Sequence, residues 1–171
     1  MDGHGERPFG PGDPVRPGRR PSLETIALGD VVTIRGERMV YEGEIMLSED
    51  GYHWQELRMA GSPERYLGVE YTPEPELTLW SAAEVPGVEP GPRDLAVDGR
   101  RYRREERGTA RFRAVNVPGL PEHGTCDYVD YVAEDGTLLS FERFQGGAWE
   151  ASFGVPVRRS EVEVTAGTRP A

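Results

Sequence analysis

Four carboxylate side chains recur in a similar order in the two halves of this sequence. Glu56 and Glu70 lie in the runs GYHWQEL and YLGVEY, and Asp130 and Glu142 lie in TCDYVDY and LLSFER. Paired carboxylates can act as acid and base, or bind a hard metal ion, when their environments differ. The four acids are therefore candidate ligand-binding residues, and they would act together in a groove between the two halves.

The recurrence also has a purely structural interpretation. Arg58, Arg65, Arg107 and Arg143 are close to these acids in the sequence or in the recurring pattern, so cross-strand ion pairs would explain the carboxylates. A repeat duplicates structural residues, whereas catalysis needs one asymmetric set. The duplication itself favours ion pairs, and a concave cluster of these acids without arginine would favour a ligand site.

Glu142 stands in the run SFER. Strand alternation places it on one face with Ser140 and Phe144 and places Phe141 on the other face. A partly buried carboxylate needs a partner, and we expect an arginine, Arg111 foremost, or a backbone N–H. Replacement of Glu142 by Ala is then expected to lower stability by about 1 to 3 kcal/mol.

A second candidate site is basic. Seven arginines and two glutamates lie between Arg100 and Arg113. Arg101, Arg103 and Arg104 are candidates for contacting an anion or an acidic partner, although strand alternation separates Arg101 and Arg103 from Arg104. The competing interpretation is that these arginines pair with the surplus acids of the chain itself.

No catalytic motif, cofactor or metal site is expected. The chain has no lysine, which excludes Schiff-base catalysis, and Cys126 is its only cysteine, which excludes an internal disulfide. His123 and Cys126 have an H-x-x-C spacing, but nothing in the sequence orients the imidazole, so a buried, inert thiol is the simpler interpretation.

Short β-prone runs separated by turn residues position these side chains. Residues 84–93 are rich in Pro and Gly and predict a linker between two similar units, residues 22–83 and 94–165. Residues 1–21 and 166–171 have no apolar periodicity and are expected to be disordered tails. We expect strands at residues 30–35, 39–47, 52–59, 65–71, 76–80, 95–97, 100–104, 109–117, 126–133, 138–144, 148–153 and 161–165.

Charge and hydropathy restrict the class of protein. The formal net charge is −10, and residues 22–165 are more acidic still, with 27 acids against 15 arginines. Nonspecific binding to nucleic acid is therefore not expected. No apolar stretch approaches the roughly 20 residues of a membrane helix, and the N-terminus lacks the apolar core of a signal peptide, so a cytoplasmic protein is expected.

The chain resembles a known bacterial family. The run GTAR at Gly108–Arg111, the run from Tyr128 to Gly154, and LGDVVTIRG, GYHWQELRM, RYLGVE and LTLW in the first half are similar to the pattern of domain of unknown function 4178. The resemblance covers Leu28 to Val164. It implies a β-rich domain that is often encoded near membrane-stress proteins of the phage-shock type and near polyamine-synthase-like enzymes, and it supplies no catalytic residues.

These observations predict an all-β protein in which two similar small antiparallel units, each a sheet of about five strands, pack as one compact domain. The expected function is that of a non-enzymatic binding or scaffolding module with a protein partner in a membrane-stress or polyamine-related system. Association with a membrane would be peripheral, through such a partner. The alternative is an enzyme or a small-ligand or metal-binding protein that uses Glu56, Glu70, Asp130 and Glu142.

Overall fold

The computed structural model describes residues 20–61, 63–71 and 73–167, and strands dominate this part of the chain. Two short 3-10 helices, η1 (Leu23–Thr25) and η2 (Arg159–Glu161), are its only helices. The strands are β1 (Val31–Ile34), β2 (Glu37–Glu49), β3 (Tyr52–Met59), β4 (Arg65–Tyr71), β5 (Pro75–Ala83), β6 (Asp94–Val97), β7 (Arg100–Val115), β8 (His123–Ala133), β9 (Leu138–Phe144), β10 (Glu150–Val157) and β11 (Val162–Thr165). The all-β prediction is confirmed.

The strands form one antiparallel sheet rather than two. Its order is β11-β1-β2-β3-β4-β5-β10-β9-β8-β7-β6, and a further pairing of β2 with β7 closes eight of these strands into a ring. The expectation of two separate small sheets is therefore wrong. Pairing β5 with β10 and β2 with β7 satisfies the backbone groups that two isolated sheets would leave exposed at their edges.

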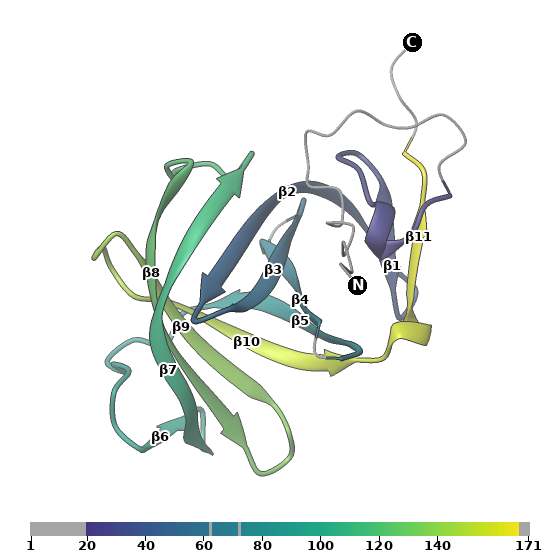
Figure 1. Cartoon of the computed structure of the whole chain (residues 1–171). Helices are drawn as coiled ribbons and strands as arrows, with labels where there is room; N and C mark the ends of the chain where they lie inside the picture. Colours follow the sequence, from purple (N-terminus) through teal and green to yellow (C-terminus); the bar gives the residue numbers. More distant parts are fainter. Residues whose placement is uncertain (1–19, 62, 72, 168–171) are drawn as a thin grey trace.

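Two long strands make this closure possible by changing partner along their length. The first part of β2 pairs with β1, and its second part, Glu44–Ser48, pairs with β7. The first part of β7 pairs with β6. As Figure 1 shows, β1 and β11 therefore lie at one end of the molecule and β6 lies at the other.

The two halves follow the same path through the sheet. Each contains a short strand, a long strand and three further strands, and in both halves the short and long strands are joined by a two-residue turn at positive φ, Arg35-Gly36 and Asp98-Gly99. The register also corresponds. In the first half, Trp54 pairs with Glu70 and Glu56 pairs with Gly68. In the second half, Tyr128 pairs with Glu142 and Asp130 pairs with Ser140. Superposition of the two halves as a true internal repeat stays a prediction.

Residues 100–104 and 109–117, expected as two strands, mostly belong to the single strand β7. A bulge between Arg104 and Glu106 interrupts its pairing with β8 without ending the strand. The bulge reverses the face on which alternate side chains lie. Tyr102 therefore packs on one side of the sheet, whereas Ala110 and Phe112 pack on the other.

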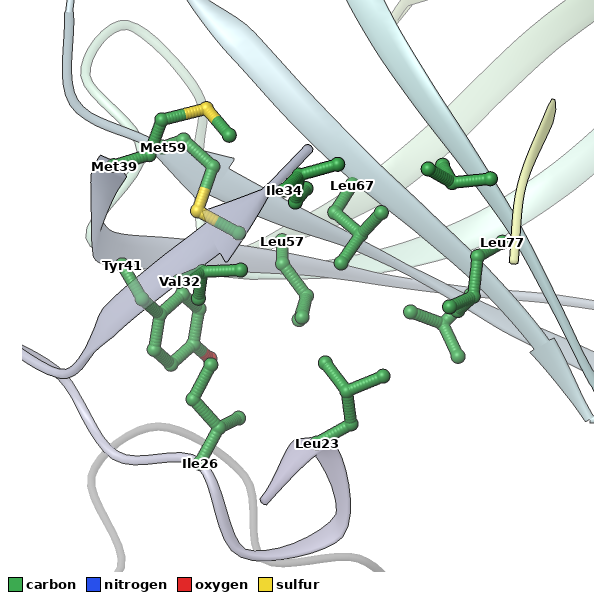
Figure 2. Packing of buried hydrophobic residues seen from close by; sticks show 12 residues of the cluster. Leu23, Ile26, Val32, Ile34, Met39, Tyr41, Leu57, Met59, Leu67 and Leu77 are labelled. Carbon is green, nitrogen blue, oxygen red and sulfur yellow. The ribbon is translucent and has the colours of Figure 1, made fainter. Parts of the chain in front are cut away.

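Apolar side chains cover both ends of the outer face of the ring. Leu57, Leu67 and Leu77 project from β3, β4 and β5 and pack against Val32 and Leu23, as Figure 2 shows. At the other end, Tyr131 of β8 accepts a hydrogen bond at 2.9 Å from the Gly91 backbone N–H and donates one at 2.8 Å to the Pro92 carbonyl. These bonds hold residues 84–93 over the second cluster, which includes Tyr102, Val129, Leu139 and Phe141.

Residues 1–19 and 168–171, most of the two expected tails, lie outside the described residues. The described part of the C-terminal segment contacts the domain, because the Gly167 backbone N–H donates to Asp30 Oδ1 at 3.3 Å. In the sequence, β11 belongs to the expected second unit, but it pairs with β1 of the first unit. The last strand therefore ties the two halves of the chain together.

Candidate ligand cavity

A partly open cavity of about 1420 Å³ lies along the inner face of the ring and extends to the loop residues 84–88 and 117–120. This volume exceeds the roughly 300 to 1,000 Å³ of common small-ligand pockets. The aromatic rings of Trp54, Tyr66, Trp80 and Trp149 contribute to its wall. A large, partly aromatic cavity of this kind is suited to an organic ligand.

The lining of the cavity is strongly acidic. All four carboxylates singled out in the sequence lie in it, Glu56 from β3, Glu70 from β4, Asp130 from β8 and Glu142 from β9. Arg107 is the only arginine among the described residues that line it. The structure thus brings the four candidate acids together, although β3 and β9 are far apart in the sequence.

Three of the four expected arginine partners pair with other acids, and the fourth, Arg107, lines the cavity without forming an ion pair with a described residue. Arg58 pairs with Glu64 at 2.7 Å and with Glu42 at 3.3 Å, Arg65 pairs with Glu37 at 2.5 Å, and Arg143 pairs with Asp127 at 2.7 Å. In the described part of the chain, no ion pair involves Glu56, Glu70, Asp130 or Glu142. The ion-pair interpretation of the four acids is therefore wrong, because strand alternation turns these three arginines toward other acids.

Glu56 and Glu142 form the centre of the cluster. Their carboxyl groups are hydrogen-bonded to each other across the ring, which requires a proton on one of them. Both side chains are half-buried by surface area, and their carboxyl groups are closely surrounded by protein atoms. Burial raises the pKa of both carboxyls, and the charge of Glu142 raises the pKa of Glu56 further. Both carboxyls therefore hold a proton more firmly than an isolated glutamate does.

Cys126 and Asp130, both on β8, lie close to the Glu56–Glu142 pair. The Cys126 thiol donates to Glu142 Oε2 at 3.8 Å, and burial together with the charge of Glu142 raises the pKa of this thiol. Ser140 donates to Asp130 Oδ1 at 2.6 Å. Burial raises the pKa of Asp130 to about 7, against the opposing effect of the Ser140 hydrogen bond.

Glu142 has a different environment from the one expected. Its face is as expected, because it lines the cavity with Ser140 and Phe144. Its partners are a second carboxyl and a thiol, whereas Arg111 is exposed on β7. The prediction of an arginine partner is wrong, because the bulge in β7 leaves Arg111 on the face opposite to Ala110, which lies on the inner face.

Glu70 lies nearer the edge of the cluster. It is exposed and pairs in register with Glu76 of β5. Partial burial raises its pKa, and the charges of Glu76 and Glu106 add to this effect. On the other side of the centre, the charge of Glu150 raises the pKa of Glu142. Further acids therefore act on the cavity carboxyls, Glu76 and Glu106 on Glu70 and Glu150 on Glu142.

The basic candidates do not converge. Arg101 and Arg103 are exposed, and neither makes an ion pair with another described residue. Arg104 is half-buried and donates to the Gly91 carbonyl, so it holds residues 84–93 in place. His123 is also exposed, with its ring 3.8 Å from Glu122, and it forms no dyad with the buried Cys126.

The sequence did not single out Trp80, Gly68 and Gly154 as parts of this site. Trp80 of β5 lies between Gly68 of β4 and Gly154 of β10. A glycine inside a strand often marks the close approach of another group, and this signal is present at both positions. In the part of the chain that the structure describes, no cluster of three or more His, Cys, Asp or Glu side chains has the arrangement of a metal site.

Comparison with known proteins identifies relatives over most of the chain. The family described as Domain of unknown function (DUF4178) matches residues 27–159. Uncharacterized proteins from Mycobacterium bovis and Mycobacterium tuberculosis are each 32% identical over 144 residues, which cover 80% of this chain and 69% of each relative. No solved structure matches the chain significantly. No described helix is long and apolar enough to cross a membrane.

Proposed function

This chain belongs to the DUF4178 family, and from the geometry of its cavity we propose that it is a non-enzymatic binding module for a small organic cation. The observation that carries the proposal is the Glu56–Glu142 carboxyl pair, which lies among further acids and has no arginine partner. A cation that entered the cavity would replace the shared proton and relieve the repulsion between the carboxylates.

The aromatic lining favours an organic cation over a hydrated metal ion. Trp54, Tyr66 and Trp80 offer faces that attract a positive charge and pack against carbon chains. The Trp149 ring already lies 4.5 Å from the Arg143 guanidinium. A metal ion instead prefers several oxygen ligands in a compact shell. An aliphatic amine combines both requirements, because its ammonium groups suit the acids and its methylene groups suit the rings.

This ligand class favours one of the two cellular systems implied by the resemblance. A polyamine-related system contains aliphatic amines with several positive charges, which suit a large cavity lined by several acids. A membrane-stress system offers no comparable match to the cavity. We retain a cytoplasmic location and a protein partner as parts of the proposal, with exposed Arg101 and Arg103 as the candidate partner contacts.

Isothermal titration calorimetry with spermidine tests the proposal. The full chain should bind spermidine saturably at physiological salt, and the double variant Glu56→Gln/Glu142→Gln should bind it at least tenfold more weakly. The matched control is Glu134→Gln/Glu163→Gln, which makes the same two substitutions at exposed positions. Equal affinities in the two double variants, or no saturable binding by the native chain, would contradict the proposal.

The same carboxyl pair also favours a second candidate, an acid–base enzyme, because two acids that share a proton can donate and accept it during a reaction. Mass spectrometry of the spermidine recovered after long incubation separates the two functions. Unchanged spermidine supports a binding module. A chemically altered product that the Glu56→Gln/Glu142→Gln variant does not form supports the enzyme.

A further inference from the structure

The indole of Trp80 lies flat against the inner face of the sheet. A Cβ atom built on Gly68 would lie 2.8 Å from Trp80 Nε1, and one built on Gly154 would lie 2.7 Å from Trp80 Cε3 and Cζ3. The two glycines belong to the strands on either side of β5, so opposite edges of the Trp80 indole cover them. Any larger residue at either position would displace or rotate the Trp80 indole.

The two glycines share the Trp80 indole as their nearest neighbour, and a Cβ on Gly154 would also lie 2.8 Å from Thr78 Cγ2. A Cβ on Gly43 would meet the backbone of Val115 and Asn116, and one on Gly108 would meet Glu49 and the Tyr128 hydroxyl. Tight backbone packing explains Gly43. Gly68 and Gly154 together make room for the indole of Trp80, which lines the cavity.

The Trp80 indole lies next to the Glu56–Glu142 carboxyl pair. Gly68, which lies under the Nε1 edge of Trp80, is the direct register partner of Glu56 on β3. Residues paired in this way have neighbouring side-chain positions about 4.5 to 5.5 Å apart. The face of the indole turned away from the glycines is therefore an aromatic surface beside the carboxyl pair.

We propose that Trp80 is a specificity-determining residue, a flat platform positioned by Gly68 and Gly154, on which the carbon chain of an alkylammonium ligand lies while its charged nitrogen meets Glu56 and Glu142. The proposal rests on the proposed function and defines its ligand class more narrowly. The ligand carries methylene groups next to a charged nitrogen, because the platform adds contact area and cation–π attraction only for such a group.

Fluorescence of Trp80 tests the platform directly. The chain contains three tryptophans, so Trp54→Phe/Trp149→Phe leaves Trp80 as the only one. Spermidine should change the emission of this variant saturably, with the same midpoint that calorimetry gives for the same variant. Calorimetric binding without any change in Trp80 emission would overturn the platform and leave the proposed function intact. Absence of calorimetric binding by the native chain would overturn both.

Substitution of the supporting glycine provides a second test. Gly154→Ala should weaken spermidine binding at least fivefold and shift the emission of Trp80, because the new methyl group displaces the ring. Gly147→Ala is the matched control, since Gly147 is exposed and outside the cavity. Should Gly154→Ala fail to fold, Trp80→Leu replaces it and should weaken binding similarly. Native affinity in either folded variant would overturn the proposal.

Discussion

Glu142 and Arg143 are neighbours on β9, yet they lie in opposite electrostatic environments. On the outer face, Arg143 contacts Asp127 at 2.7 Å and lies 4.5 Å from the centre of the Trp149 ring. On the inner face, Glu142 contacts another carboxyl and a thiol. At these two neighbouring positions, the outer charge is compensated by an ion pair and the inner charge is not. Uncompensated buried charge costs stability, so its presence on one face points to a function there.

The largest expected effect comes from removing the inner charges. Glu56→Gln/Glu142→Gln should raise the free energy of unfolding at pH 8 by about 2 to 4 kcal/mol, because two buried carboxylates no longer repel each other. Urea denaturation measures this change. The structure thereby reverses the loss of stability that the sequence led us to expect for Glu142→Ala. A decrease in the double variant would show that the pair is a net stabilising contact.

The second effect is a pH dependence of stability set by the inner face. Because burial raises the pKa of Asp130 from 3.8 to about 7, its protonated form stabilises the folded state at low pH. This contribution to stability is fully present below pH 4 and is lost as the pH rises through 7. The raised pKa values of Glu56 and Glu142 likewise lower stability as the pH rises.

Unfolding free energies measured from pH 5 to pH 8 test this dependence. Asp130→Asn should remove about 1 to 3 kcal/mol of the decrease over this range. Asp127→Asn is the control from the outer face, because Thr109 and Arg143 hold the pKa of Asp127 below its usual range. An unaltered slope in Asp130→Asn would mean that Asp130 does not titrate in this range.

A smaller effect is expected from the outer ion pair. Arg143→Ala should lower the free energy of unfolding by about 1 kcal/mol, from the loss of one partly exposed ion pair and one cation–π contact. The loss should shrink in 1 M NaCl, where exposed charges are screened. Urea denaturation at both salt concentrations measures it. A loss above 3 kcal/mol would mean that the outer pair is as deeply buried as the inner one.

The smallest effect is expected at Arg111, the residue that the sequence suggested as the partner of Glu142. Arg111→Ser should change the free energy of unfolding by less than about 0.5 kcal/mol, because its side chain is exposed and makes no ion pair with another described residue. Thermal unfolding of this variant beside Arg143→Ala provides the comparison. A larger loss for Arg111→Ser would restore the expected contact with Glu142.

Much of the candidate site could be predicted from strand periodicity. Alternation placed Glu142 on one face with Ser140 and Phe144, and the recurring order of residues selected four acids that all line the cavity. Their partners could not be predicted. The bulge in β7 sets the face of Arg111, and a bulge depends on pairing with a neighbouring strand. The choice between ion pairs and a ligand site depended on this geometry.

The sequence by itself determined the all-β class, most of the strands and the family, because turn residues and alternating apolar positions are local signals. Only the tertiary structure decided that the strands form one closed sheet and that acids from β3 and β9 meet inside it. The physical reason is that closure joins strand edges that are distant in the chain, and no local pattern specifies which edges pair. The cavity, its carboxyl pair and its Trp80 platform all follow from that closure.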